Sequence, residues 1–437
     1  MKFYTLLFVF FSSICGYAQN KQSYAFDFGA WKVAKNYTGV GPNSTYSDEQ
    51  GYGFDFNTLP QFLNSGKGNA LKSDAVTSKA PFYFSVKVPE GNYKVTAYLG
   101  SKAQAGISTV KAESRRLMLE NIETKKGEFK KEVFIVNIKD RKISEGKSVS
   151  LKPREYGKLD WDDRLTLEFD INTVLYALTI EPVDNQVTVF LSGNSTVVNQ
   201  DEEPWASWGQ MIPRFFKPGV AIANHAESGL TLGSFLGSKR LEKILSVAKP
   251  GDYLFIEFGH NDQKEKGPND GAYKSYTGRL KTFVKEFRAI GGNPVIVTST
   301  SRRAFDENGN VVPTLGDFPD AARKVAKELA VPLVDLNQQT KIFYKALGVE
   351  GSKRAFVHYP ANTFPGQTAA LADNTHFNPY GAYEISKMIV EGIKENELPI
   401  AKFLKDGEKF NPASPDNADA WKWPESPKIA ILKPDGN

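Results

Sequence analysis

Apolar residues alternate with polar ones through the first half of the chain, which is the pattern of half-buried β-strands. Phe and Val occupy positions 82, 84, 86 and 88, and the same alternation resumes at 93, 95, 97 and 99 after a Pro- and Gly-containing stretch at 89–92. Two alternating runs joined by a short turn predict a β-hairpin. Further strands are predicted at 133–138, 165–169 and 176–180. Because no convincing helical spacing interrupts them, residues 21–184 are expected to form an all-β sandwich.

The pattern changes after Asp184, where short continuous apolar runs alternate with amphipathic stretches. The runs lie at 187–191, 220–223, 253–258, 295–298 and 333–335. Between them, residues 241, 244, 245 and 248 keep helical spacing, as do 280, 283, 284 and 287. Fully apolar strands alternating with helices predict a parallel sheet covered on both faces. A three-layer α/β domain is therefore expected over residues 185–403.

The last stretch, residues 404–437, is rich in Pro, Asp and Lys and has no clear periodicity. It contains Trp421 and Trp423, two large side chains whose burial stabilises a folded protein. We expect an irregular tail that these two tryptophans hold against the rest of the protein.

Length and composition agree with a two-domain globular protein. The chain has 437 residues, too many for one ordinary domain, and apolar residues make up 41% of it, enough for two cores. Its formal net charge is only +5, and the basic residues are mixed with acidic ones throughout. This distribution lacks the basic footprint of a nucleic-acid-binding protein.

The N-terminus has the features of a signal peptide. Lys2 precedes an apolar run at 4–11, and small residues at 16 and 18 precede a predicted cleavage after Ala18. The run is too short to span a membrane, so export to the periplasm or the medium is expected. Cys15 raises lipoprotein anchoring as the alternative, although Ile14 fits a lipobox poorly. Because this cysteine is the only one in the chain, the exported protein can have no disulfide.

Polar motifs follow the ends of several predicted strands. They are Gly193-Asn194-Ser195-Thr196, the segment 224–229 with His225 and Gly229, the segment 259–262 with His260, Asn261 and Asp262, and, before the last helix, 373–376 with Asp373 and His376. Parallel sheets bind ligands at the carboxyl ends of their strands, where these motifs would meet.

The residue types at these positions match the needs of acyl transfer. Such a reaction uses a nucleophile, a base, an acid that orients the base, and donors for the oxyanion. Ser195 can be the nucleophile, and Asp373 and His376, on one loop, can be the orienting acid and the base. The α/β-hydrolase elbow is excluded, because G-x-S-x-G would need Gly at position 197, which is Val.

Structural alternatives exist for these residues. Ser195 could cap a helix, and His376 could be a surface histidine. His225 and His260 could connect loops by hydrogen bonds, contact a substrate, or share a metal site, but the histidines are scattered and no metal site is expected. Asp262 suits a loop anchor better than a catalytic acid.

Other polar and aromatic side chains leave two interpretations open. Arg302 and Arg303 follow the fourth strand and are either a solvated pair or directed at the rim of the site. Trp205 and Trp208 either pack the first helix or stack on a sugar. Tyr83 and Tyr98 are expected in the core or in hairpin pairs.

Four motifs, taken in chain order, resemble the four blocks of the SGNH (GDSL) hydrolases. They are Gly193-Asn194-Ser195, Gly229, Gly259-His260-Asn261-Asp262 and Asp373-x-x-His376. Within that superfamily, five short segments are similar to the rhamnogalacturonan acetylesterases. They read S-G-N-S-T-V-V, W-G-Q, N-H-A-E-S-G-L-T, E-F-G-H-N-D and D-N-T-H-F-N. The resemblance covers residues 187 to about 395. The β domain is similar in texture to the galactose-binding-like modules that precede some of these esterases.

The resemblance implies a flavodoxin-like hydrolase domain and a serine esterase that needs no cofactor. Ser195 would be the nucleophile, His376 the base and Asp373 its orienting acid. The oxyanion would be held by the N–H groups of Ser195 and Gly229 and by the Asn261 amide. The expected substrate is an acetylated pectic polysaccharide or oligosaccharide, with xylan, or glycan binding without catalysis, as the alternatives.

The resemblance also bears on two features near the site. Arg302 or Arg303, if directed at the site, would bind a galacturonate carboxylate. Asn194 departs from the G-D-S motif of the superfamily, and we expect its side chain to hold the turn by hydrogen bonds. The oligomeric state cannot be predicted from the sequence.

Overall fold

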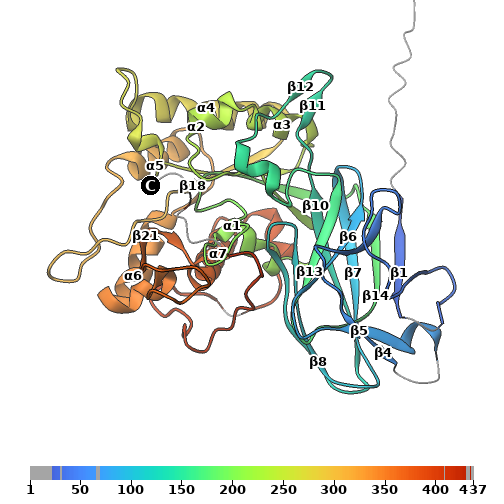
Figure 1. Cartoon of the computed structure of the whole chain (residues 1–437). Helices are drawn as coiled ribbons and strands as arrows, with labels where there is room; N and C mark the ends of the chain where they lie inside the picture. Colours follow the sequence, from blue (N-terminus) through green and yellow to red (C-terminus); the bar gives the residue numbers. More distant parts are fainter. Residues whose placement is uncertain (1–21, 30–31, 65–68, 408, 430–433, 435–437) are drawn as a thin grey trace, which may run out of the picture.

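The computed structural model describes residues 22–29, 32–64, 69–407, 409–429 and 434. The predicted signal peptide and Cys15 lie outside these ranges. The described chain forms an all-β unit followed by an α/β unit, and the two lie side by side (Figure 1). The last strand of the first unit ends at Pro182, and the first strand of the second begins at Val187.

The first unit is a sandwich of two mainly antiparallel sheets. One sheet has the order β10-β7-β14-β1-β2, with β5 also paired to β14 and β4 paired to β5, and the other has the order β3-β6-β13-β8-β9. Buried aromatic and aliphatic residues of both sheets fill the space between them, as is usual for sandwiches. The strands are β1 Tyr24–Phe28, β2 Thr38–Val40, β3 Tyr52–Asp55, β4 Gln61–Asn64, β5 Asp74–Thr77, β6 Phe82–Lys87, β7 Gly91–Gly100, β8 Gly106–Ala112, β9 Arg116–Thr124, β10 Phe129–Ile138, β11 Lys142–Ser144, β12 Lys147–Ser148, β13 Arg164–Phe169 and β14 Val174–Pro182. Two 3₁₀ turns, η1 Ala70–Lys72 and η2 Pro153–Gly157, are its helical segments among the described residues.

The predicted hairpin at residues 82–99 is wrong, although both of its strands exist. β6 pairs with β3 and β13, whereas β7 pairs with β10 and β14. The turn between them therefore crosses from one sheet of the sandwich to the other. Alternation shows that each strand has one buried face, but it does not identify the partner strand.

The second unit is a doubly wound α/β domain, as predicted. Its five strands are parallel and lie in the order β16-β15-β17-β18-β19, which is the flavodoxin-like order 2-1-3-4-5. The strands are β15 Val187–Ser192, β16 Val220–Asn224, β17 Tyr253–Phe258, β18 Asn293–Thr298 and β19 Leu333–Val334; a separate antiparallel pair is formed by β20 Phe356–Tyr359 and β21 Leu371–Phe377.

Helices cover both faces of this sheet, because successive strand residues point to opposite sides (Figure 1). Val189 and Leu191 of β15 pack with α1, α6 and α7, whereas Phe190 packs with α2, α3, α4 and α5. The helices are α1 Trp208–Met211, α2 Leu232–Gly237, α3 Arg240–Val247, α4 Thr277–Ala289, α5 Phe318–Glu328, α6 Leu336–Gly351 and α7 Pro379–Glu395. Short turns are η3 Ile212–Phe215, η4 Asp262–Lys264, η5 Ala272–Tyr276, η6 Ser352–Ala355 and η7 Pro399–Phe403. No helix in the described part of the chain is both long and apolar enough to cross a bilayer.

The tail contacts both units, since Nζ of Lys111 on β8 donates to the carbonyl of Pro424 at 2.7 Å and the tryptophans of the tail pack on the hydrolase unit. From Leu404 to Ile429 its described residues form only isolated bridges with the rest of the chain. Trp421 packs on Tyr383 of α7, and the Nε1 of Trp423 donates a hydrogen bond of 2.8 Å to Glu203. The two tryptophan rings stack on each other with centroids 6.0 Å apart.

Charged side chains are buried where the two units meet. The guanidinium of Arg240 on α3 donates to both carboxylate oxygens of Glu155 on η2, at 2.7 and 2.6 Å, and to the carbonyl of His225 at 3.1 Å. The side chains of Arg240 and Glu155 are 0% and 1% exposed. Removing one partner of such a buried pair is strongly destabilising, because the other charge is left uncompensated.

We therefore expect Arg240→Met to lower the free energy of unfolding by about 3–5 kcal/mol, because it leaves the Glu155 carboxylate buried without its cation. The matched control is Lys281→Met, whose pair with Glu328 is exposed on both sides. That variant should lose less than about 1 kcal/mol. Urea unfolding of both variants measures the difference, and similar small losses would contradict a structural role for the buried pair.

Candidate active site

Ser195 lies in a tight turn directly after β15. This strand lies between β16 and β17, where the strand order of the sheet reverses. The carbonyl of Asn194 accepts the N–H groups of Val197 and Val198, each at 3.0 Å. A Cβ at Gly193 would lie 2.4 Å from the Val197 side chain, so the turn can close only around glycine. The turn is buried, and Ser195 itself is 3% exposed.

Ser195, His376 and Asp373 form a continuous hydrogen-bonded chain. The Oγ of Ser195 is 2.8 Å from Nε2 of His376, and Nδ1 of His376 is 2.7 Å from Oδ2 of Asp373. The two hydrogen bonds use opposite nitrogens of one imidazole, which is the arrangement of a nucleophile, a base and an orienting acid. Residues 181 positions apart are thus brought into direct contact.

The environment of Asp373 keeps it charged. Burial alone would raise the pKa of Asp373, but the hydrogen bond and charge of His376 and the N–H groups of His376 and Thr375 lower that pKa to about 2. These two N–H groups donate to Oδ1 at 3.0 and 2.8 Å. The carboxylate is therefore ionised at neutral pH and able to stabilise a positive charge on the imidazole.

The loop that carries Gly229 is docked on the turn of the serine. The N–H of Glu227 donates to the carbonyl of Gly193 at 3.3 Å, and the N–H of His225 donates to that of Leu191 at 2.9 Å. Gly229 has φ +77°, a left-handed conformation that favours glycine. Its position after the second strand of the sheet places this loop beside Ser195.

Asn261 and Asp262 follow the neighbouring strand β17. The Nδ2 of Asn261 donates to the carbonyl of Leu230 at 3.2 Å, which uses one of its two amide hydrogens. Asp262 accepts the N–H of Leu232 on one carboxylate oxygen and the N–H of Gly259 on the other, both at 2.9 Å. Asp262 thus connects two loops of the site, and burial raises its pKa to about 7.

Asp373 and His376 lie on strand β21, not on the loop expected from the sequence. Arg302 and Arg303 contact the two strand residues between them, rather than standing in solvent as a pair. The Nε of Arg302 donates to Thr375 Oγ1 at 3.2 Å, and Nη1 of Arg303 donates to Asn374 Oδ1 at 3.0 Å. Both side chains are only partly buried. They therefore lie at the rim of the site, next to the candidate base.

Two further histidines and two tryptophans of the hydrolase unit are packed inside. The rings of His225 and His260 are buried, and the hydrogen bonds that tie their loops are accepted by their backbone carbonyls, from Arg240 and Arg302. Trp205 and Trp208 are 2% and 1% exposed, so the interpretation that they stack on a sugar is wrong. Within the described residues, no cluster of three or more His, Cys, Asp or Glu side chains could hold a metal ion.

Glu257, which the sequence analysis missed, lies beneath the serine turn. Its Oε1 lies 2.8 Å from Thr196 Oγ1, its Oε2 accepts Trp208 Nε1 at 2.5 Å, and Thr196 Oγ1 also lies 3.1 Å from Asn194 Oδ1. Burial raises the pKa of Glu257 to about 7. The sequence does contain a sign of this contact, because a carboxylate at the end of the apolar run 253–258 would be buried and must have a hydrogen-bond partner.

A second missed group comes from the β domain. Lys152, Arg154 and Lys158 reach across to Glu227 and Ser228 in the loop before Gly229. No sequence pattern could have linked these residues to the site, since they belong to the other structural unit.

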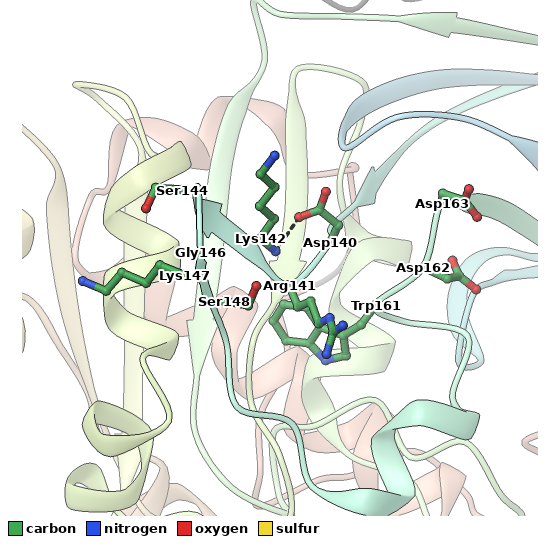
Figure 2. Close-up of a pocket in the computed structure, with 10 residues that line it drawn as sticks. All are labelled: Asp140, Arg141, Lys142, Ser144, Gly146, Lys147, Ser148, Trp161, Asp162 and Asp163. Carbon is green, nitrogen blue, oxygen red and sulfur yellow. Dashed lines mark hydrogen bonds between the residues drawn. The ribbon is translucent and has the colours of Figure 1, made fainter.

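One cavity is lined by residues of the β unit alone, and another by residues of both units. The cavity in Figure 2 has a volume of about 530 Å³ and is lined by residues of the segments 140–148 and 161–163, including Trp161. Its lining includes none of the three hydrogen-bonded residues Ser195, His376 and Asp373. A smaller cavity of about 280 Å³ lies closer to the serine, since its lining includes Ser228, Arg154 and Gln200, whose amide donates to the Ser195 carbonyl at 3.0 Å.

Comparison with protein families finds two matches that follow the two structural units. A model described as the GDSL-like lipase/acylhydrolase family matches residues 191–382. A model described as beta-agarase/YXIM esterase-like, galactose-binding domain-like, matches residues 24–144.

Comparison with individual proteins finds similar relatives in Bacillus subtilis (strain 168). Rhamnogalacturonan acetylesterase RhgT is 44% identical over 220 residues, covering 50% of this chain and 94% of RhgT. The uncharacterized esterase YxiM is 24% identical over 394 residues, covering 87% of this chain and 93% of YxiM. The crystal structure of the YxiM protein matches 86% of this chain and 99% of its own, with 23% identity and a TM-score of 0.46.

The hydrogen bonds around Glu257 lead to a prediction about pH and stability. If Glu257 is protonated, its O–H can donate to Thr196, whose hydroxyl then donates to Asn194, so that every group in the chain is satisfied. The amide of a glutamine can make the same bonds. Since the pKa of Glu257 rises from 4.5 to about 7 on folding, its protonation stabilises the fold below pH 4.5, and that stability is lost as the pH rises through 7.

Glu257→Gln should therefore match the wild-type free energy of unfolding near pH 4.5 and exceed it by about 2–3 kcal/mol at pH 8. Asp262 titrates in the same range but is present in both proteins, so it cancels in the difference. Urea unfolding at the two pH values measures this. A variant that is equally destabilised at both would contradict the proton on Glu257.

Proposed function

This chain belongs to the GDSL-like lipase/acylhydrolase family and is a carboxylic ester hydrolase. We propose that it is an exported esterase that removes acetyl groups from pectin, with rhamnogalacturonan I as its main substrate. The observation that carries the proposal is the hydrogen-bonded chain from Ser195 through His376 to Asp373. The similarity to RhgT supports the choice of substrate.

In the proposed reaction, Oγ of Ser195 attacks the acetyl carbonyl carbon while Nε2 of His376 takes the hydroxyl proton. Asp373 orients the imidazole and stabilises its positive charge. The sugar oxygen leaves with the proton from His376, and an acetyl group remains on Ser195. His376 then takes a proton from water, whose oxygen attacks the acetyl carbonyl. The bond from the carbonyl carbon to Oγ breaks, His376 returns the proton to Oγ of Ser195, and acetic acid leaves and ionises to acetate.

The oxyanion of each tetrahedral intermediate is held by the N–H groups of Ser195 and Gly229 and by the amide of Asn261. Gly229 and Asn261 follow strands that flank β15, so their loops border the serine turn. The hydrogen on Asn261 Nδ2 that does not bind Leu230 serves the oxyanion. A neutral amide keeps this role at any pH, and one such donor contributes roughly 3–4 kcal/mol to the transition state.

Export belongs to the same proposal and is supported by the pattern of residues 1–18. The exported protein would begin at Gln19, which the mass of the mature chain tests.

Ser195→Ala should lower the rate of acetate release from acetylated pectin by at least about 10⁴-fold, because the attacking oxygen is removed. Asn194→Asp should keep at least about a tenth of the wild-type rate, since the carboxyl retains the oxygen that accepts from Thr196 and loses only an amide that is buried without a hydrogen-bond partner. Acetate is measured enzymatically, with circular dichroism to confirm that both variants fold. Equal losses in the two variants would contradict the role of Asn194 as a residue that only holds the turn.

The choice of pectin over xylan is tested with Arg302. Its Nη1 has no hydrogen-bond partner in the described part of the chain, and we assign it to a galacturonate carboxylate of the substrate. Arg302→Met should raise the KM for acetylated rhamnogalacturonan fragments about tenfold, the value of one charge-assisted hydrogen bond. It should change kcat/KM for p-nitrophenyl acetate by less than about threefold, since that ester has no carboxylate.

The aryl ester is also the control for the bond between Arg302 and Thr375, whose loss would slow both substrates alike. Faster release of acetate from acetylated xylan than from rhamnogalacturonan would overturn the pectin assignment. Glycan binding without acetate release from any of these esters would favour a non-catalytic binding protein.

A further inference from the structure

Cationic side chains of the β domain converge on the peptide that precedes Gly229. Lys152 Nζ and Arg154 Nη2 each donate to the carbonyl oxygen of Ser228, both at 2.7 Å. Both residues lie at the start of η2, more than 70 positions before Ser228 in the sequence. Ser228 as a whole residue is buried, and its carbonyl accepts these two bonds from the other domain of the protein.

The carbonyl of Ser228 and the N–H of Gly229 belong to one planar peptide unit and point in opposite directions. A cation on the carbonyl oxygen draws electron density from the peptide nitrogen and makes its N–H a stronger donor. We propose that Lys152 and Arg154 orient and polarise the Ser228–Gly229 peptide, so that the β domain supplies part of the oxyanion site. This inference rests on the proposed function, in which the Gly229 N–H binds the oxyanion.

The neighbouring residue of the loop is held by the same domain. The carboxylate of Glu227 accepts from Lys158 at 2.9 Å and pairs with Arg154 at 2.7 Å. Its desolvation would raise the pKa of Glu227, but the charges of Lys158 and Arg154 lower it, so Glu227 remains ionised. The loop is therefore fixed on both sides of the peptide bond between Glu227 and Ser228, by charge-assisted bonds that are roughly twice as strong as neutral ones.

The segment that carries the two cations is itself rigidly placed. Glu155 accepts the N–H of Lys152 at 2.8 Å and binds the guanidinium of Arg240, which in turn donates to the carbonyl of His225 at the start of the same loop. A donor that is fixed before the reaction stabilises the transition state without a reorganisation cost. Lys152 and Arg154 are thus positioning residues that act through the backbone of Ser228 and Gly229.

The test uses the full-length protein and the variants Lys152→Met, Arg154→Met and the double variant. We expect kcat for acetate release to fall about tenfold in each single variant and about 100-fold in the double variant, which is less than the loss of a whole oxyanion donor. KM should change by less than about twofold, because the uncharged ester binds before the oxyanion forms. Lys152→Arg should recover most of the wild-type kcat, and Lys152→Gln, which keeps a neutral donor, should give an intermediate rate.

Two further measurements separate this role from a merely structural one. Methylboronic acid forms a tetrahedral adduct with an active serine, and its inhibition constant should rise in parallel with the fall in kcat. The matched control is Lys147→Met, which removes an exposed ion pair with Glu242 between the same two domains and should leave kcat and the inhibition constant unchanged.

The results distinguish the two proposals. If Ser195→Ala is inactive but the Lys152 and Arg154 variants keep the wild-type kcat, the positioning role is refuted and the esterase function stands. If Ser195→Ala retains activity, the esterase mechanism itself fails. A fall in kcat that accompanies a lower melting temperature, without weaker binding of methylboronic acid, would also overturn the positioning role. Should Lys152→Met fail to fold, the comparison of Lys152→Arg with Lys152→Gln decides.

Discussion

The parallel pairing of β15 with β16 on one side and β17 on the other is the constraint on which the site depends. It brings three loops to one edge of the sheet, where their buried backbone groups must find partners. The carbonyls of Leu191 and Gly193 meet this requirement by accepting N–H groups from the loop after β16. The geometry around Ser195 is thus a continuation of the hydrogen bonding within the sheet.

The second constraint is the burial of charge between the two units. Glu155, Glu227 and Glu203 each lose water on folding, and each is paired with a cation from the opposite unit. Buried pairs add little net stability, but a misplaced one is costly, because it leaves a charge without a partner. They therefore fix the orientation of the β domain on the hydrolase domain, so that Lys152 and Arg154 of one contact the Ser228 carbonyl of the other.

Local periodicity and motif spacing predicted most of the elements and the residues that gather at the site. The apolar runs of the second half became the five strands of the parallel sheet, and Ser195, Asp373 and His376, separated by about 180 positions, came into contact. The hairpin failed because alternation describes one strand and its faces, whereas pairing depends on the whole sandwich. Lys152 and Arg154 were not predictable, since their roles come from the contact between domains.

The asparagine before the nucleophile is explained by the carboxylic acid beneath it. Thr196 Oγ1 lies 3.1 Å from Asn194 Oδ1 and 2.8 Å from Glu257 Oε1, but a hydroxyl has only one hydrogen to donate. Two ionised carboxylates around it would leave one acceptor unsatisfied and place two negative charges beneath the turn of Ser195. With a neutral Asn194 and a Glu257 whose pKa is raised to about 7, the turn holds its shape without a fixed negative charge. Asn194 and Glu257 therefore form one unit, in which the residue accepted at position 194 depends on the proton held at position 257.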